Sequence, residues 1–217
     1  MTRFKTTSLA DRVFEKLEND IIFGVYPRGE ILTELKLVEQ LGVSRTPIRE
    51  ALRRLEQERL IEETGKGSLV LGITEEDLLD ILDIRLRVEG LAARYAARNI
   101  TDEAAAELCH VVELQEFYAQ KGDAEHIRAM DDQFHTQVWA ASRHNVISDT
   151  LAPLHRKTQR YRKASIEDPQ RAAMIVQEHR AICDAIASHN PALAQAAMEA
   201  HTKNARQNML ERAGYSG

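Results

Sequence analysis

The chain has 217 residues, of which 43% are apolar and 5% aromatic, and its formal net charge is −5. This is enough apolar material for one large or two modest domains, and sparse aromatics with abundant alanine favour helices over sheet. Because there is no run of 18 apolar residues, no apolar N-terminal segment and no CxxC pair, neither membrane spanning nor export is indicated, and a cytoplasmic location is expected.

The charge is unevenly distributed. Residues 1–72 carry 12 basic and 12 acidic side chains, so the whole negative excess lies in the remainder of the chain. A neutral N-terminal part can still bind DNA through a local basic patch, because phosphate attraction is screened beyond roughly 10 Å at ordinary salt.

The N-terminal part begins with a helix predicted over residues 8–23, followed by a turn and a short extended piece at 31–32. A second helix is predicted over 34–41. After Gly42-Val43 a third helix begins, because Ser44 or Thr46 can cap it and Pro47 lies in its first turn.

This third helix carries an apolar stripe on one face and a row of arginines on another. The stripe is Ile48, Ala51, Leu52 and Leu55, and the row is Arg45, Arg49 and Arg53. Because glutamates interleave with the arginines, a solvated surface helix is the alternative interpretation. The context favours DNA binding, since the second and third helices form a helix-turn-helix pattern.

Two short strands are predicted over 60–63 and 68–71, around the glycine-rich basic turn Thr64-Gly65-Lys66-Gly67. Three helices and this hairpin together predict a winged helix-turn-helix domain over residues 1–72.

The run VSRTPIREALRRLEQERLI, preceded by IIFGVYPRGEIL and followed by GKGSLV, resembles the N-terminal domain of the GntR family of bacterial transcription regulators. The resemblance implies a homodimer that reads a palindromic double-stranded DNA operator. The reading helix would place Arg45, Thr46 and Arg49 at the major groove, and Ser44 would hold phosphate. Lys66, with Gly67 allowing close approach, would reach the DNA backbone or the minor groove.

Beyond a linker near Gly72, residues 73–217 are predicted to form an antiparallel six-helix bundle. Helix starts are marked by Thr74, by Thr101 or Asp102, and by the pairs Asp168-Pro169 and Asn190-Pro191. The predicted helices are 74–98, 102–120, 123–142, 145–163, 168–188 and 191–212. The overall fold class is therefore mostly α.

Polar side chains interrupt the inward stripes of three of these helices: Asp131 with His135, His179, and His201. For each histidine alone, a core residue with a hydrogen-bond partner is the simpler interpretation. Together, four unpaired buried polar groups would cost roughly 1–3 kcal/mol each, a cost that one shared cation removes. Three nitrogens and one oxygen suit a divalent transition metal such as Zn²⁺ or Ni²⁺.

The strings DDQFH, QEHRAICDAI and AAMEAHTKNA resemble the FCD domain, the C-terminal ligand-binding domain of the FadR branch of GntR regulators. In metal-binding members an aspartate and three histidines hold the ion; by position these are Asp131, His135, His179 and His201. The resemblance covers residues 77–210, and six helices match the shorter, VanR-like subgroup.

The run RLRVEGLAARYAA resembles the first helix of that domain and contains Arg85. An ion pair with Glu89 within the helix is one interpretation. If Arg85 instead faces the cavity, its planar guanidinium suits a carboxylate that also coordinates the metal, which predicts a small organic or sugar acid as effector. Among other candidates, His155 could lie near the pocket mouth, while Arg162 is assigned to a solvated face together with Arg156 and Arg160.

These features predict a ligand-responsive, metal-containing transcription regulator rather than an enzyme. A metal-dependent hydrolase fused to a DNA-binding head is an alternative, although no spare glutamate or histidine is spaced to act as general base. A regulator that senses the metal itself is the third possibility.

Overall fold

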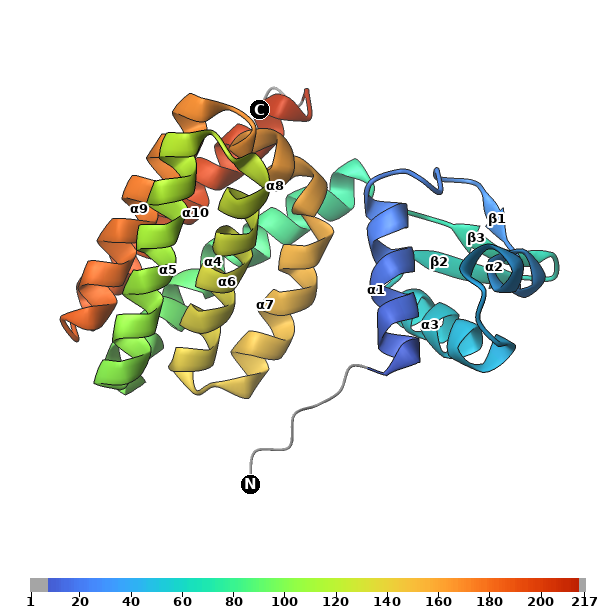
Figure 1. Cartoon of the computed structure of the whole chain (residues 1–217), viewed down its shortest axis with the longest axis horizontal. Helices are drawn as coiled ribbons and strands as arrows, with labels where there is room; N and C mark the ends of the chain where they lie inside the picture. The colour runs from blue at the N-terminus through green and yellow to red at the C-terminus, as the bar shows by residue number, and fades with distance from the viewer. Residues whose placement is uncertain (1–7, 215–217) are drawn as a thin grey trace. The chain divides into compact units, whose positions relative to one another are not determined.

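The computed structural model describes residues 8–214 and divides into two compact units, the first extending to Asp77 and the second beginning at Leu78 (Figure 1). Gly72, at the predicted linker, lies in the non-helical segment between the last strand and the first helix of the second unit. The outermost parts of the two predicted domains, residues 1–7 and 215–217, lie outside the described residues.

The N-terminal unit is a winged helix-turn-helix. Its elements are α1 (Leu9–Ile22), β1 (Ile31–Leu32), α2 (Glu34–Leu41), α3 (Arg45–Gln57), β2 (Ile61–Thr64) and β3 (Gly67–Val70). The strands form an antiparallel sheet in the order β1-β3-β2, with Ile61 opposite Val70 and Thr64 opposite Gly67. The predicted mostly helical fold with an N-terminal wing is confirmed.

The core of this unit contains the inward stripe predicted for the third helix, together with residues of α1 and β1. Leu17 of α1, Ile48 and Leu55 of α3, and Leu32 of β1 are all fully buried in one cluster. The apolar stripe holds one face of α3 against α1. The other face of α3, which carries the arginines, therefore stays at the surface.

Local turns place α3. Gly42 ends α2 in the left-handed conformation, with φ of 64°, and Ser44 is the residue immediately before α3, although its side chain makes no capping hydrogen bond. After α3, Arg59 also has a positive φ, of 59°. A side chain in this conformation is strained because its Cβ approaches the backbone.

The exposed Arg59 offers a test of this turn. Arg59→Gly is expected to raise the free energy of unfolding by about 0.5–1 kcal/mol, because relief of the left-handed strain exceeds the added backbone entropy of glycine. The measurement is equilibrium urea unfolding of the full chain, followed by far-UV circular dichroism. Arg53→Gly, at an exposed position inside α3, is the matched control and should destabilise by about 1 kcal/mol. Equal destabilisation by both substitutions would contradict the prediction.

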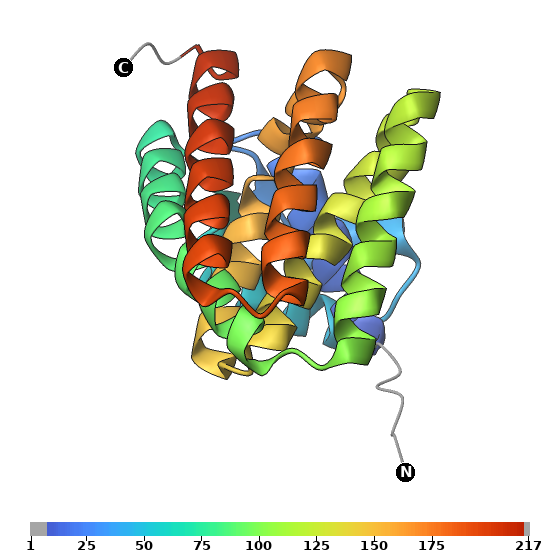
Figure 2. The ribbon, with the colours of Figure 1, turned by 90° about the vertical axis from the view of Figure 1, so that its left-hand side faces the viewer.

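The C-terminal unit is a bundle of antiparallel helices. They are α4 (Glu75–Asn99), α5 (Asp102–Lys121), α6 (Ala124–Ser142), α7 (Asn145–Lys157), α8 (Gln159–Ile166), α9 (Pro169–Ala187) and α10 (Pro191–Arg212). Figure 2 shows α10, α9 and α5 side by side. Their apolar core includes Phe134 and Val138 of α6, Ile182 of α9 and Met198 of α10.

The bundle has seven helices within residues 8–214, where six were predicted. The helix expected over 145–163 is interrupted at Thr158, which separates α7 from α8. The fully buried hydroxyl of Thr158 donates to the carbonyl of His155 at 3.0 Å and accepts from Nη1 of Arg85 at 3.0 Å. This buried polar contact with α4 competes with a continuous helix, and no local spacing indicated it.

The predicted helix starts are confirmed where side chains cap backbone amides. Thr74 caps Asp77, Thr101 caps Ala104, and Asn190 caps Leu193.

Among the described residues, no helix has the combined length and apolar character required to cross a bilayer.

Candidate functional site

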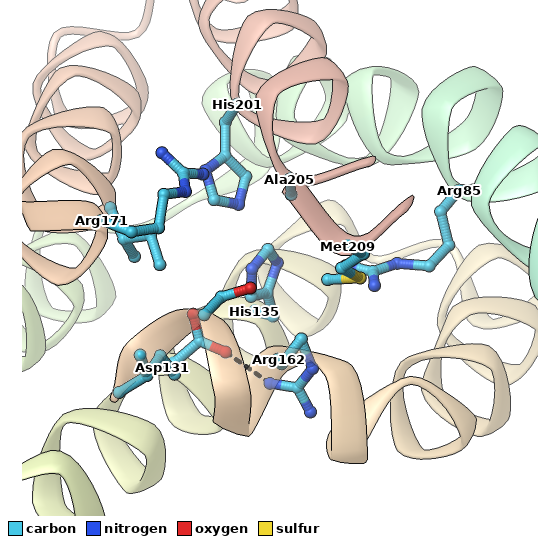
Figure 3. A pocket seen from close by; sticks show the side chains of 11 residues that line it. Arg85, Asp131, His135, Arg162, Arg171, His201, Ala205 and Met209 are labelled. Carbon is cyan, nitrogen blue, oxygen red and sulfur yellow. Dashed lines mark hydrogen bonds and ion pairs between the residues drawn. The ribbon is translucent and has the colours of Figure 1, made fainter. Parts of the chain in front are cut away.

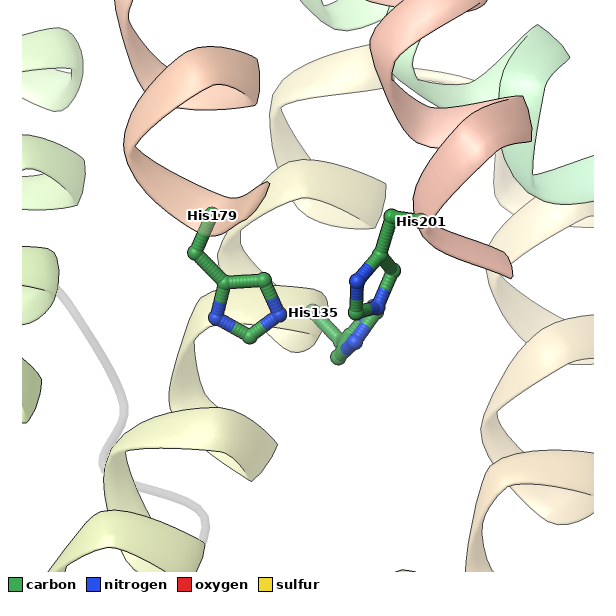
Figure 4. A group of neighbouring side chains, drawn as sticks. All are labelled: His135, His179 and His201. Atoms are coloured by element: carbon green, nitrogen blue, oxygen red, sulfur yellow. The ribbon is translucent and has the colours of Figure 1, made fainter. Parts of the chain in front are cut away.

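Three histidines from three helices converge inside the bundle (Figure 4). His135 of α6, His179 of α9 and His201 of α10 are at most 3% exposed, and one ring nitrogen from each lies within 4.8 Å of the others. The ring centres of His179 and His201 are 4.7 Å apart, and each lies 5.3 Å from that of His135. Helix packing thus gathers the three predicted imidazoles.

Each imidazole has an acceptor beside its Nδ1. Nδ1 of His179 lies 2.8 Å from Oε1 of Gln115, and Nδ1 of His201 lies 2.7 Å from Oε2 of Glu178. Nδ1 of His135 lies 3.3 Å from Oε2 of Glu89. Protons held at Nδ1 of His179 and His201 leave their Nε2 lone pairs available, which is the tautomer that a metal ligand requires. Nδ1 of His135 makes no hydrogen bond within residues 8–214.

The orientation of His179 supports the same conclusion. Its ring stacks on Phe134 with centres 4.0 Å apart, and its Nε2 is buried without a hydrogen bond inside the described part of the chain. Burial, together with electrostatic repulsion from the neighbouring His201 and His135 whenever those rings are protonated, holds the pKa of His179 well below its ordinary value. A neutral imidazole with an unsatisfied nitrogen fits a divalent transition metal.

The predicted fourth ligand, Asp131, lies beside this group. Its Oδ1 is 3.8 Å from Nε2 of His179, and it is 3% exposed. Its other oxygen, Oδ2, accepts from Nη1 of Arg162. Although burial alone would raise the pKa of Asp131, the Arg162 guanidinium lowers it, so the carboxylate stays ionised.

The assignment of Arg162 to a solvated face was wrong. Its side chain is 5% exposed and donates to two adjacent carboxylates, those of Asp131 and Asp132. The charge pattern of α8 alone suggested a surface, whereas partners on α6 allow the guanidinium to be buried with its charge compensated.

Arg85 of α4 forms the intrahelical ion pair and also faces the pocket. It is 1% exposed, its Nε donates to Oε1 of Glu89 at 2.6 Å, and its Nη1 donates to Thr158. The intrahelical pair therefore exists, but it is buried, and Arg85 also lines the pocket next to the histidines.

Figure 3 shows this pocket, around which three arginines come from three different helices. Its lining comprises Arg85, Asp131, His135, Arg162, Ser165, Ile166, Arg171, Ile175, His201, Ala205 and Met209. The cavity measures about 20 Å³, which is room for about one water-sized ligand. A larger effector therefore requires the movement of lining side chains such as Met209.

Four residues of this centre were missed from the sequence: Arg162, Arg171, Gln115 and Glu178. Gln115 is fully buried and follows Leu108 and Val111 at helical spacing, so the rule that found His179 could have found it. Arg171 binds Glu178 through two parallel hydrogen bonds of 2.8 and 3.0 Å. Burial alone would raise the pKa of Glu178, but hydrogen bonds from His201 and Arg171 lower it to about 2.

The predicted DNA-contacting side chains lie at the surface of the N-terminal unit. Ser44, Arg45, Thr46, Arg49 and Lys66 are exposed, while Gly67 is half-buried. A Cβ at Gly67 would come within 2.6 Å of the carbonyl oxygen of Leu32, and its φ is 131°. Close packing against β1 therefore requires this glycine, independently of any approach to DNA.

Arg49 is held by α2. Its Nε donates to Oε1 of Glu34 at 2.7 Å, and the Arg49 side chain remains 62% exposed. The ion pair orients the guanidinium while leaving its remaining donors available at the surface.

Comparison with known proteins identifies both units. Residues 9–70 match the bacterial regulatory proteins of the gntR family, and residues 80–204, more than half of the chain, match the FCD domain. The chain belongs to the GntR family. It is a DNA-binding transcription regulator with a C-terminal FCD effector-binding domain.

Two relatives illustrate the relationship of this GntR protein. It is 31% identical over 201 residues to a probable D-xylose utilization operon transcriptional repressor of Paenarthrobacter nicotinovorans, covering 92% of this chain and 88% of that protein. It is 34% identical over 136 residues to a gluconate operon transcriptional repressor of Bacillus licheniformis, covering 63% of this chain and 56% of that repressor. The second match thus spans little more than half of the gluconate repressor.

Solved structures show the same fold. McbR/YncC of E. coli matches with a TM-score of 0.79 at 22% identity, covering 95% of this GntR chain and 99% of McbR/YncC. A putative GntR regulator from Rhodococcus sp. RHA1 matches with a TM-score of 0.69 at 20% identity, covering 93% and 97% of the two chains. These relatives and neighbours are regulators, not enzymes.

Proposed function

We propose that the FCD domain holds one divalent transition metal, Zn²⁺ or Ni²⁺, and a small carboxylate effector that controls operator binding. The observation that carries this proposal is the convergence of three buried imidazoles within 4.8 Å, with Oδ1 of Asp131 3.8 Å from His179. His135, His179, His201 and Asp131 would be the ligands. When bound, the ion supplies a Lewis acid position for a carboxylate oxygen.

The charges around the pocket support an anionic effector. Four buried or half-buried carboxylates, those of Glu89, Asp131, Asp132 and Glu178, face three guanidinium groups, those of Arg85, Arg162 and Arg171. With neutral imidazoles the set has one net negative charge, and a divalent ion changes this to one positive charge. A monocarboxylate then restores neutrality, which favours its binding where the dielectric is low.

Arg85 is the proposed effector contact because it lines the pocket on the side of α4. Its planar fork suits a carboxylate, and its bonds to Glu89 and Thr158 hold it in position. The relation to a gluconate operon repressor makes sugar acids a natural first panel of test ligands.

In the DNA-binding unit, we assign Arg45, Thr46 and Arg49 to the major groove, Ser44 to a phosphate, and Lys66 to the backbone or minor groove. A homodimer would present two such surfaces to a palindromic operator. All five side chains are exposed, as direct contact requires.

The test measures operator release by fluorescence anisotropy, using an operator selected from random DNA. Metal-loaded and chelator-treated protein are each titrated with a panel of small hydroxy acids and sugar acids. A carboxylate should change the affinity for operator DNA at least 10-fold in the metal-loaded protein. It should leave this affinity unchanged in the chelator-treated protein. Arg85→Lys should lose this response while retaining metal.

Other outcomes distinguish the alternatives. A response to metal with no carboxylate would indicate a metal sensor. An equal carboxylate response with and without metal would contradict the proposed role of the ion.

A further inference from the structure

A second group of ligand-type atoms adjoins the histidines. Asp131, Asp132 and His155 also place one ligand atom each within 4.8 Å of one another. Nε2 of His155 lies 3.0 Å from Oδ1 of Asp132, and the His155 side chain is 6% exposed. Asp131 also lies beside the histidine group, because its Oδ1 is 3.8 Å from Nε2 of His179. Its carboxylate could therefore bridge two ions, as carboxylates do in two-metal centres.

A guanidinium group occupies this second position. Nη1 of Arg162 donates to Oδ2 of Asp131, Nη2 lies 2.7 Å from Oδ1 of Asp132, and Nη2 lies 3.4 Å from the carbonyl oxygen of His155. Arg162 is buried and thus places a permanent positive charge among the three residues that would otherwise bind a cation.

The two oxygens of Asp131 consequently have different neighbours. Oδ2 faces Arg162, while Oδ1 lies 3.8 Å from Nε2 of His179. A carboxylate held in this way can offer only Oδ1 to an ion among the histidines.

We propose that Arg162 is a positioning and specificity-determining residue that stands in for a second cation. It holds Asp131 as a one-oxygen ligand and limits the centre to a single metal ion. The role of Asp131 as a one-oxygen ligand rests on the proposed function, because it requires an ion among the histidines. The exclusion of a second cation depends only on Asp131, Asp132, His155 and Arg162.

Removal of the guanidinium should open the second position. Two carboxylates and one imidazole are a suitable ligand set for Zn²⁺ or Co²⁺. In a tetrahedral site with bonds of about 2.1 Å, ligand atoms lie roughly 3.4 Å apart, so atoms now within 4.8 Å of one another need to approach by at most about 1.4 Å. Loss of the positive charge also removes the repulsion that a second ion would meet.

The experiment is metal stoichiometry, measured by equilibrium dialysis of the full-length protein against Zn²⁺ followed by elemental analysis. The parent protein and Arg162→Lys, which keeps the charge, should bind one equivalent. Arg162→Gln should bind two, and Arg162→Gln with Asp132→Asn should return to one. Arg160→Gln, an exposed change on the same helix, should leave the value at one.

Two results would overturn the proposal: a folded Arg162→Gln protein that binds no more Zn²⁺ than the parent protein, or a parent protein that already binds two equivalents. Folding is checked by circular dichroism and by fluorescence of Trp139, the single tryptophan, whose ring lies 5.2 Å from that of His155. If Arg162→Gln unfolds without metal, Zn²⁺ should restore its fold by replacing the lost charge, and failure to do so would contradict the inference.

The same data separate this inference from the proposed function. If the parent protein binds no metal, the ion proposed among the three histidines is ruled out. If Arg162→Gln then gained one equivalent that Asp132→Asn abolished, the role of Arg162 would stand.

Discussion

Replacing His179 by alanine is expected to lower the affinity for Zn²⁺ about 100-fold or more. Structural zinc sites with four ligands contribute about 10–16 kcal/mol, so that one ligand accounts for roughly a quarter of this free energy. His179 is fully buried, and its Nε2 has no hydrogen-bond partner within residues 8–214. The carboxylate response of operator binding should disappear with the metal.

The measurement is competition with a calibrated chelator, supported by elemental analysis of the purified protein. Because His179 also stacks on Phe134, the variant loses packing as well as a ligand. Phe134→Leu removes the stacking partner without removing a nitrogen, so it should retain the metal affinity. His110→Ala removes an imidazole that is 66% exposed and should change nothing. Full metal occupancy in His179→Ala at the parent affinity would count against the proposed site.

Replacing Arg49 by alanine is expected to weaken operator binding roughly 10- to 100-fold, the range for loss of a bidentate guanine contact. The loss should be largest on the selected operator and small on random DNA, because base contacts discriminate whereas phosphate contacts do not. Anisotropy titrations on both DNA sequences measure this difference, and metal content should stay unchanged.

Glu34→Gln provides the matched control for Arg49. It removes the negative charge from the 2.7 Å pair between α2 and α3, which weakens the pair, but it keeps the guanidinium. If Arg49 contacts bases directly, Glu34→Gln should cause a much smaller loss than Arg49→Ala. Equal losses would mean that Arg49 acts mainly by holding the two helices together.

Much of the N-terminal unit could be predicted because its signals are local. Pro47, the stripe from Ile48 to Leu55 and the Thr64 to Gly67 turn each act within a few residues. The strand positions differ from prediction by one residue, since Gly67 pairs with Thr64 and extends β3 toward the turn.

The C-terminal centre was only partly predictable. Asp131, His135, His179 and His201 could be found because each breaks an apolar stripe, a feature visible within one helix. The interruption at Thr158 could not be found in this way, because its cause is a hydrogen bond to Arg85, 73 residues earlier in the chain. The burial of Arg162 likewise depends on Asp131, 31 residues away.

The sequence by itself determined the reading helix, the basic hairpin and the inward direction of four metal-type side chains, since side-chain direction follows from position along a helix or strand. Only the tertiary structure decided which of these groups meet and which charges are buried. It brought Gln115 and Glu178 to the imidazoles and set Arg162 between two carboxylates. The physical reason is that pairing between helices depends on their packing distances and angles, and these are set by the whole core rather than by any one segment.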